Sequence, residues 1–288
     1  MHDMKVLAAT DGSKYGRWAI EWLAQVPFSA QPVVRVLHVV DVAGLRAPFM
    51  IQPVIVGSER YIQLELKRME MNAKATKKQS AMLLASLGLT GTVSVDRGGV
   101  AATIMKHAKR DVGLLSIGSR GLDALDRFML GSTSNHAIHQ APCSVLVVKE
   151  APRPVRQIVL AIDGSPASDK AVRFFLRNFN PTPDGPDGEP LTVTVLHVMP
   201  YFKYPELREA GKTVVQRYGG KVAKVGFQVH EALRLGKPAD EILKVAKQHK
   251  ADVIITGAKG LNAIGRVLLG SVSTRVVQHA TCSVLVVR

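Results

Sequence analysis

The stretch Gly118-Ser119-Arg120-Gly121, followed after nine residues by Gly131-Ser132, occurs a second time in this chain. The second copy reads Gly257-Ala258-Lys259-Gly260 and, again after nine residues, Gly270-Ser271. Each motif of the second copy lies 139 residues beyond its counterpart. Self-similarity at a fixed distance indicates a duplicated unit, so the chain of 288 residues is expected to hold two related domains.

The duplication extends outward from these glycines on both sides. The run Cys-Ser-Val-Leu-Val-Val at 143–148 returns at 282–287 with the same offset of 139. Upstream, Asp-Gly-Ser at 11–13 returns at 163–165 with an offset of 152, and Leu-His-Val at 37–39 returns at 196–198 with an offset of 159. The changing offset indicates 7 additional residues in the second copy, near 181–188, and 20 additional residues in the first copy before Gly118.

A proline-containing linker, Lys-Glu-Ala-Pro-Arg-Pro at 149–154, separates the two copies. Proline resists continuing either a helix or a strand, so we expect one domain at 1–150 and the other at 155–288. The additional segment of the first copy includes the apolar stretch 49–56. It is interpreted as a lid over a binding site, an apolar surface for a partner, or a passive loop.

Within each copy, short apolar runs alternate with helical patterns. The predicted strands are 4–9, 33–40, 91–96, 112–117 and 144–148, then 156–162, 191–198, 225–233, 252–256 and 282–287. The predicted helices of the first copy are 14–25, 58–87, 100–109 and 132–139. Alternation of this kind requires right-handed crossovers and a parallel sheet with helices on both faces. The fold class is therefore α/β, doubly wound, twice over.

Composition limits the class of protein. Apolar residues make up 47% of the chain and charged residues 21%, as in globular proteins. We find neither a secretory signal nor an apolar stretch of the roughly 20 residues that span a bilayer, and two cysteines cannot form a disulfide framework. A cytoplasmic location without membrane insertion is expected. The net charge of +15 favours anionic partners or is only a solvated basic surface.

The glycine pattern, with its flanking motifs, resembles the nucleotide-binding sequence of the ATP-binding universal stress proteins. The resemblance covers nearly the whole chain as a tandem pair. It implies two Rossmann-like domains of the adenine nucleotide alpha hydrolase type, each a five-stranded parallel sheet of strand order 3-2-1-4-5. It also implies that an aspartate binds ribose and a valine backbone binds adenine. The expected nucleotide-binding residues are Asp11, Val39, Gly118, Gly121, Gly131, Ser132, Ser134, Asp163, Val198, Gly257, Gly260, Gly270, Ser271 and Ser273.

The chemistry of these positions supports the same interpretation. The glycine pairs follow the fourth strand of each copy, where glycine lets backbone N–H groups approach a phosphate. Gly131 and Gly270 open helices, whose N-termini carry unpaired N–H groups and a partial positive charge. In a sheet of this order, ligands bind outside the carboxyl ends of the strands where the strand order reverses. The expected ligand is ATP or AMP, with Mg²⁺ accompanying ATP.

Several of these features have structural alternatives. Asp-Gly-Ser after a strand is also typical of a turn with a helix cap, and the glycines are also typical of structural turns. His38, His197, Cys143 and Cys282 are interpreted as structural residues. Basic residues at matching loop positions neutralise phosphates or are merely solvated: Arg120 with Lys259, and Arg127 with Arg266.

The sequence lacks a P-loop, a dinucleotide-binding Gly-x-Gly-x-x-Gly, a zinc cluster and a shared nucleophile with a general base. We therefore expect a binding and signalling protein with at most weak ATP hydrolysis, and the resemblance implies that it is a stress-response sensor or regulator. The resemblance implies that the two domains pack about a pseudo-two-fold axis through their final strands, as single-domain relatives do in their homodimers. A homodimer of the whole chain is a further expectation. A protein partner is expected but not identified. The alternatives are an ATP-using enzyme and a nucleotide-independent basic protein that binds nucleic acid or other anionic partners.

Overall fold

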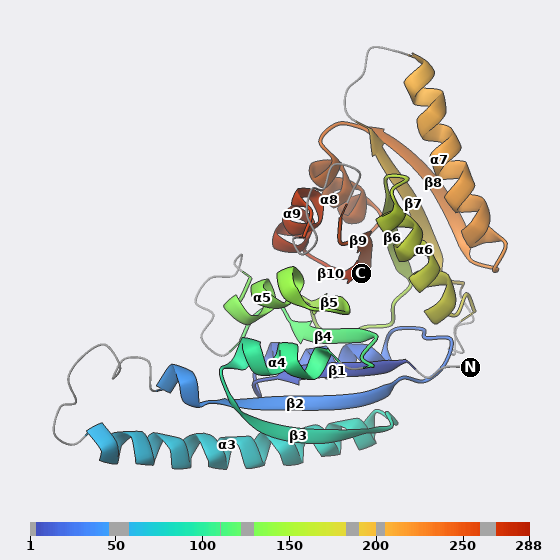
Figure 1. Ribbon diagram of the computed structural model, residues 1–288. Coiled ribbons are helices and arrows are strands. Elements are labelled where there is room, and N and C mark those ends of the chain that lie inside the picture. The colour runs from blue at the N-terminus through green and yellow to red at the C-terminus, as the bar shows by residue number, and fades with distance from the viewer. Residues whose placement is uncertain are drawn as a thin grey trace.

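The computed structural model describes residues 4–45, 58–109, 111–121, 130–182, 190–199, 205–259 and 269–288. Ten strands of these residues form one continuous sheet in the order β3-β2-β1-β4-β5-β10-β9-β6-β7-β8 (Figure 1). The predicted additional stretch at 49–56, most of the predicted loop at 181–188, and Gly260, Arg127 and Arg266 lie outside the described residues.

The first half alternates strands and helices as the sequence predicts. Its strands are β1 (Lys5–Thr10), β2 (Val33–Asp41), β3 (Gly91–Gly98), β4 (Leu114–Gly118) and β5 (Ser144–Val148). Its helices are α1 (Lys14–Glu21), the 3-10 turn η1 (Trp22–Ala24), α3 (Ser58–Ser86), α4 (Val100–Ala108) and α5 (Ser132–Gln140). The predicted helix 14–25 thus tightens into a 3-10 turn at its end.

The second half repeats this arrangement. Its strands are β6 (Gln157–Ile162), β7 (Thr192–Met199), β8 (Gln228–Leu235), β9 (Val253–Gly257) and β10 (Ser283–Val287). Its helices are α6 (Pro166–Asn178), α7 (Pro205–Ala223), α8 (Pro238–Gln248) and α9 (Ser271–His279). In both halves the strands pair in parallel in the order 3-2-1-4-5, which confirms the predicted α/β class and topology.

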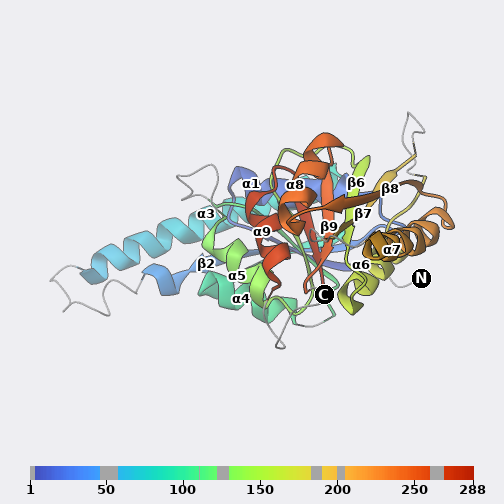
Figure 2. The same cartoon turned by 90° about the horizontal axis from the view of Figure 1, so that it is seen from above.

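The central strands are buried on both faces, and successive side chains point to opposite layers. Val6 and Ala8 of β1 pack in a core with α1, α3, α6 and α7, whereas Leu7 and Ala9 pack in a second core with α4, α5, α8 and α9. Each core contains residues of both halves, so the two repeats form one packed body. Helix α3 projects beyond the sheet, as the views in Figures 1 and 2 both show.

The two halves join through their last strands, as the resemblance implies. Strands β5 and β10 pair in the antiparallel direction, with Leu146 opposite Leu285. The residue after each strand reaches the last turn of a helix in the other half: Lys149 Nζ donates to the carbonyl of Ala280 at 2.7 Å, and Arg288 Nη2 donates to that of Ile138 at 2.5 Å. Cations suit helix C-termini, so the pseudo-two-fold axis relates two reciprocal caps.

Candidate functional site

The predicted site residues gather at the carboxyl edge of the sheet, beside the ends of β1 and β4. Asp11 follows β1, and Gly121 lies in the loop that follows β4. A Cβ atom added to Gly121 would come within 2.6 Å of Asp11 Oδ2, so the second glycine of the motif lies directly against the carboxylate. The topology therefore brings together two residues that are far apart in the sequence. Strand order reverses at this point, which is where ligands bind in sheets of this kind.

The Asp-Gly-Ser motif forms a turn and a helix cap in both halves. Ser13 accepts a hydrogen bond from the N–H of Gly16 at 3.1 Å and donates its own N–H to Asp11 Oδ1 at 2.9 Å. The glycine of the turn, Gly12, has φ +83°, a conformation that glycine adopts without strain. In the second half, the N–H of Ser165 donates to Asp163 Oδ1 at 3.0 Å. The motif therefore forms the turn and helix cap, and this turn fixes each carboxylate at the sheet edge.

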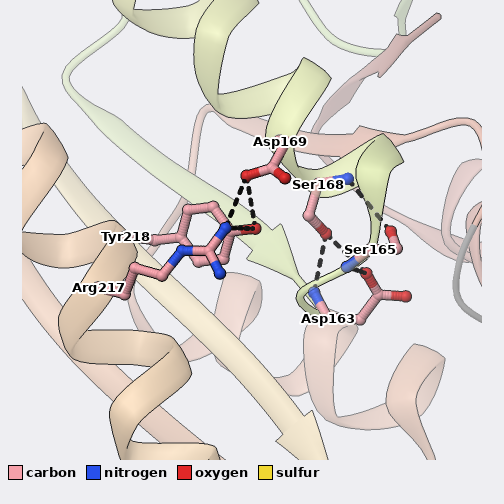
Figure 3. A network of polar contacts seen from close by, with 6 residues as sticks. All are labelled: Asp163, Ser165, Ser168, Asp169, Arg217 and Tyr218. Atoms are coloured by element: carbon pink, nitrogen blue, oxygen red, sulfur yellow. Dashed lines mark hydrogen bonds and ion pairs between the residues drawn. The ribbon is translucent and has the colours of Figure 1, made fainter.

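A serine hydroxyl contacts the carboxylate of Asp163 and has no counterpart at Asp11. The hydroxyl of Ser168 donates to Asp163 Oδ1 at 2.7 Å and accepts the N–H of Asp163 at 2.9 Å, as Figure 3 shows. The residue at the same place in α1 is Gly16, which has no side chain to offer Asp11. A Cβ atom on Gly16 would lie 2.8 Å from Asp11 Oδ1. This difference was not predictable from the repeated motifs, because position 168 lies outside them.

Gly118 and Gly257 are required by packing inside the protein. A Cβ atom on Gly118 would meet the carbonyl oxygen of Tyr15 at 2.6 Å, and one on Gly257 would meet that of Ala167 at 2.8 Å. Backbone atoms of α1 and α6 cannot move away as the end of a flexible side chain can. These two glycines therefore let the helix after the first strand lie against the end of the fourth strand.

Gly131 and Gly270 have no comparable internal requirement in their backbone angles. Gly131 has φ −61° and Gly270 has φ −67°, which any residue adopts. A Cβ atom on Gly131 would make only ordinary contacts, the nearest being Arg120 Cα at 3.5 Å. Neither glycine offers a side-chain cap, so the first N–H groups of α5 and α9 lack the hydroxyl partner that Ser13 gives α1. Helices α4 and α8 share this lack of a side-chain cap.

The serines of the motif divide into two kinds. Ser132 and Ser271 are exposed at the first turn of their helices. Ser134 and Ser273 are buried, and their hydroxyl groups donate to the carbonyls of Gly118 at 2.6 Å and Gly257 at 2.7 Å. We expected Ser134 and Ser273 to be donors to a ligand, but in the structure their hydrogens hold the helix against the glycine loop.

Val39 and Val198 lie just beyond the end of the first strand of each half. The pairing of β1 with β2 stops at Thr10 opposite His38, so Val39 lies at the level of Asp11. The pairing of β6 with β7 likewise stops at Ile162 opposite His197. The histidine rings bond backbone carbonyls at 3.0 Å, His38 that of Thr10 and His197 that of Ile162, in keeping with a structural role.

Arg120, in the first glycine loop, is engaged within the protein. Arg120 Nη1 donates to the hydroxyl of Tyr15 at 2.6 Å, and its guanidinium carbon lies 5.2 Å from the centre of that ring. The corresponding residues in the second half are Lys259 and Ala167, so this stacking has no counterpart there. The contact of Tyr15 with Arg120 was not predictable from the sequence, because Tyr15 lies outside the repeated motifs.

Both cysteines lie at the base of buried strands. Burial raises the pKa of the Cys143 thiol to about 11 and that of Cys282 to about 12. A thiol with so high a pKa holds almost no nucleophilic thiolate at neutral pH, which supports the structural interpretation.

Among the described residues, no group of three or more histidine, cysteine, aspartate or glutamate side chains could hold a metal ion. Within the same parts of the chain, none of the helices is long and apolar enough to cross a membrane.

Comparison with known proteins agrees with this architecture. A universal stress protein of Mycolicibacterium smegmatis (strain ATCC 700084 / mc(2)155) is 29% identical, over 98% of this chain and 96% of that protein. The crystal structure of a universal stress protein from Archaeoglobus fulgidus DSM 4304 superposes with TM-score 0.69 at 19% identity, covers 100% of this chain and 99% of that one, and shows the shared fold.

A universal stress protein family protein from Arabidopsis thaliana was solved with AMP bound. It is 21% identical with TM-score 0.34, over 46% of this chain and 90% of that one, which is too low a similarity to describe the site of this chain. The family model described as the universal stress protein family matches residues 4–149 and again residues 154–288. With two matches that together span nearly all of its length, this chain belongs to the universal stress protein family.

Proposed function

We propose that each half of the chain binds one adenine nucleotide, ATP or AMP, at the carboxyl edge of its sheet. The observation that carries the proposal is the pair Gly131 and Gly270. Neither backbone angle demands glycine, and both residues open a helix whose first N–H groups lack a side-chain cap. A glycine that the protein does not need for its own conformation fits close approach of a phosphate to those N–H groups.

The other residues are assigned by their place at the same carboxyl edge of the sheet. In the first half, the loop Gly118–Gly121 and the helix start Gly131-Ser132 bind the phosphates. In the second half, the loop 257–260 and Gly270-Ser271 do the same. The carboxylates of Asp11 and Asp163 accept hydrogen bonds from the ribose hydroxyls, since one carboxylate can accept from both members of a diol. The backbone at Val39 and Val198 receives adenine, and Mg²⁺ accompanies the phosphates of ATP.

We further propose that the protein senses nucleotide rather than consuming it, as a stress-response regulator in the cytoplasm. In each domain (1–150 and 155–288), binding would order the glycine loop. It would also change a surface that a protein partner recognises. The sequence offers no paired nucleophile and general base near the glycine loop that both copies share, and on this ground we propose at most slow hydrolysis. Steady turnover of ATP would instead favour an enzyme.

The proposal is tested by ATP titration of the full chain after its bound nucleotide has been removed. We expect about two sites per chain, one site in each single variant Gly131→Val and Gly270→Val, and none in the double variant. Gly99→Val is the matched control: Gly99 also opens a helix without a side-chain cap, a Cβ there would make only an ordinary contact at 3.7 Å, and no glycine motif precedes it. No binding by the wild-type chain, or equal loss in the control, would refute the proposal.

The net charge of +15 supports one second candidate, a basic protein that binds nucleic acid without nucleotide. That candidate predicts affinity for nucleic acid that falls steeply with salt and is unchanged in the Gly131→Val and Gly270→Val double variant.

A further inference from the structure

A hollow of about 430 Å³ lies between α1 and α3 in the first half. Its lining includes Gly12, Arg17, Ile20, Thr76, Ser80 and Leu83. The hollow is bounded mainly by apolar atoms, with hydroxyl groups on α3 and one guanidinium on α1. Pockets for small ligands commonly have this size and this mixture of surfaces.

In the second half, a tyrosine side chain fills the space that corresponds to this hollow. A Cβ atom on Gly12 would approach Thr76 on α3, and one on Gly164 would approach Val214 on α7, so Thr76 and Val214 occupy the same place. One helical turn further along, Ser80 therefore corresponds to Tyr218. Ser80 is 5% exposed and Tyr218 is 0% exposed, so both side chains point into the core. A buried tyrosine ring in one half is replaced by a hydroxymethyl group in the other.

The charge opposite this position is reversed between the halves. The hydroxyl of Tyr218 donates to Asp169 Oδ1 at 2.9 Å, and Arg217 Nη2 reaches the same oxygen at 3.1 Å (Figure 3). Asp169 lies on α6 at the place that Arg17 occupies on α1, by the offset of 152 that relates the two Asp-Gly-Ser motifs. In the second half, the phenol of Tyr218 donates a hydrogen bond to a carboxylate. In the first half, the hollow is bordered by the guanidinium of Arg17.

We propose that the hollow between α1 and α3 binds a small aromatic carboxylate of the benzoate class. Its ring would take the place of the Tyr218 ring, beside Ser80, and its carboxylate would face Arg17. Arg17 Nε lies 3.5 Å from Glu21 Oε1, and the guanidinium has further N–H donors for a second carboxylate. A cavity of about 150 Å³ suffices for benzene, so the hollow has room for the ring and its charged group.

The experiment measures benzoate binding to the full chain by ligand-observed NMR and calorimetry, with no nucleotide present. It therefore does not depend on the proposed nucleotide sites. We expect saturable binding of one benzoate per chain, and much weaker binding of phenol and of acetate, which lack the charge and the ring respectively. Arg17→Gln should weaken benzoate at least about tenfold, as one lost charge-assisted hydrogen bond does, with phenol unaffected.

Ser80→Phe supplies the matched occupant, because its ring fills the space as Tyr218 does in the second half. Benzoate binding should then disappear. Arg17 has a side chain that is 60% exposed, so Arg17→Gln folds even if Ser80→Phe does not. Absence of benzoate binding at about 10 mM, or binding that Arg17→Gln leaves unchanged, would overturn the proposal.

Discussion

The two halves of the chain place their first aspartate in the same turn, yet the surroundings of that turn differ. Asp163 accepts the hydroxyl of Ser168, and beside it Tyr218 fills the space between α6 and α7. In the first half these two places hold Gly16 and Ser80, and a hollow remains between α1 and α3. The glycines that helix packing requires, Gly118 and Gly257, are the same in both halves, whereas residues beside the first aspartate and between the helices differ. The halves therefore share the backbone of this turn and differ in the side chains around it.

The largest expected effect concerns the shared framework. Gly118→Ala and Gly257→Ala should each lower the free energy of unfolding by roughly 2–3 kcal/mol, since the added methyl group meets a helix carbonyl oxygen. Gly131→Ala should cost less than about 1 kcal/mol, because its Cβ makes only ordinary contacts. Urea unfolding of the three variants measures this. If only one of the first two is destabilised, the halves do not share this packing requirement.

An intermediate effect concerns Tyr218, the residue that only the second half has. Tyr218→Phe should cost about 1 kcal/mol at pH 7, because the hydrogen bond to Asp169 is lost. That bond is the main cause that lowers the pKa of Asp169 below its ordinary 3.8. The stability it contributes is therefore complete above pH 3.8 and is lost as the pH falls through the lower folded value. Urea unfolding at pH 6 and pH 3 should show the difference between wild type and variant shrinking in acid; a constant difference would contradict this cause.

A similar loss is expected at the two reciprocal caps. Lys149→Met and Arg288→Met should each cost about 1 kcal/mol, because each removes the donor of a part-buried hydrogen bond to a helix carbonyl. Burial lowers the pKa of Lys149 to about 8 from 10.5. Between these values the unfolded chain binds more protons, so the stability of wild type relative to Lys149→Met should rise with pH across that window. Unfolding measurements near pH 7.5 and 9.5 test the sign, and a fall in this difference would show that burial is not the dominant influence.

The smallest effect concerns the hydroxyl on the second carboxylate. Under the proposed function, Ser168→Gly should raise the ATP affinity of the second site a few-fold, since Asp163 regains an acceptor position for ribose. Calorimetric titration in a Gly131→Val background isolates that site. Unchanged affinity would indicate that Ser168 does not compete with the ligand.

Much of the fold follows from the sequence because each repeated motif lies at a strand end. The strand predicted at 225–233 shows where apolar pattern fails: β8 begins only at Gln228, because Gly226 has φ +107° and breaks the extended run. The turn and helix cap at Asp11 were predictable from Asp-Gly-Ser, and the structure shows both; the ribose-binding role of Asp11 remains a proposal. The match of Ser80 with Tyr218 was not predictable, because it depends on how α3 and α7 align against the sheet.

The most direct test of the account is the number of adenine nucleotides that one chain holds. Purified protein is heat-denatured, the released nucleotide is identified by chromatography, and the stripped protein is then saturated with ATP. The account predicts about two nucleotides per chain in two classes of different affinity, one lost with Gly131→Val and the other with Gly270→Val. Absence of nucleotide together with no binding at millimolar ATP would contradict it, and the glycine motifs would then serve the fold alone.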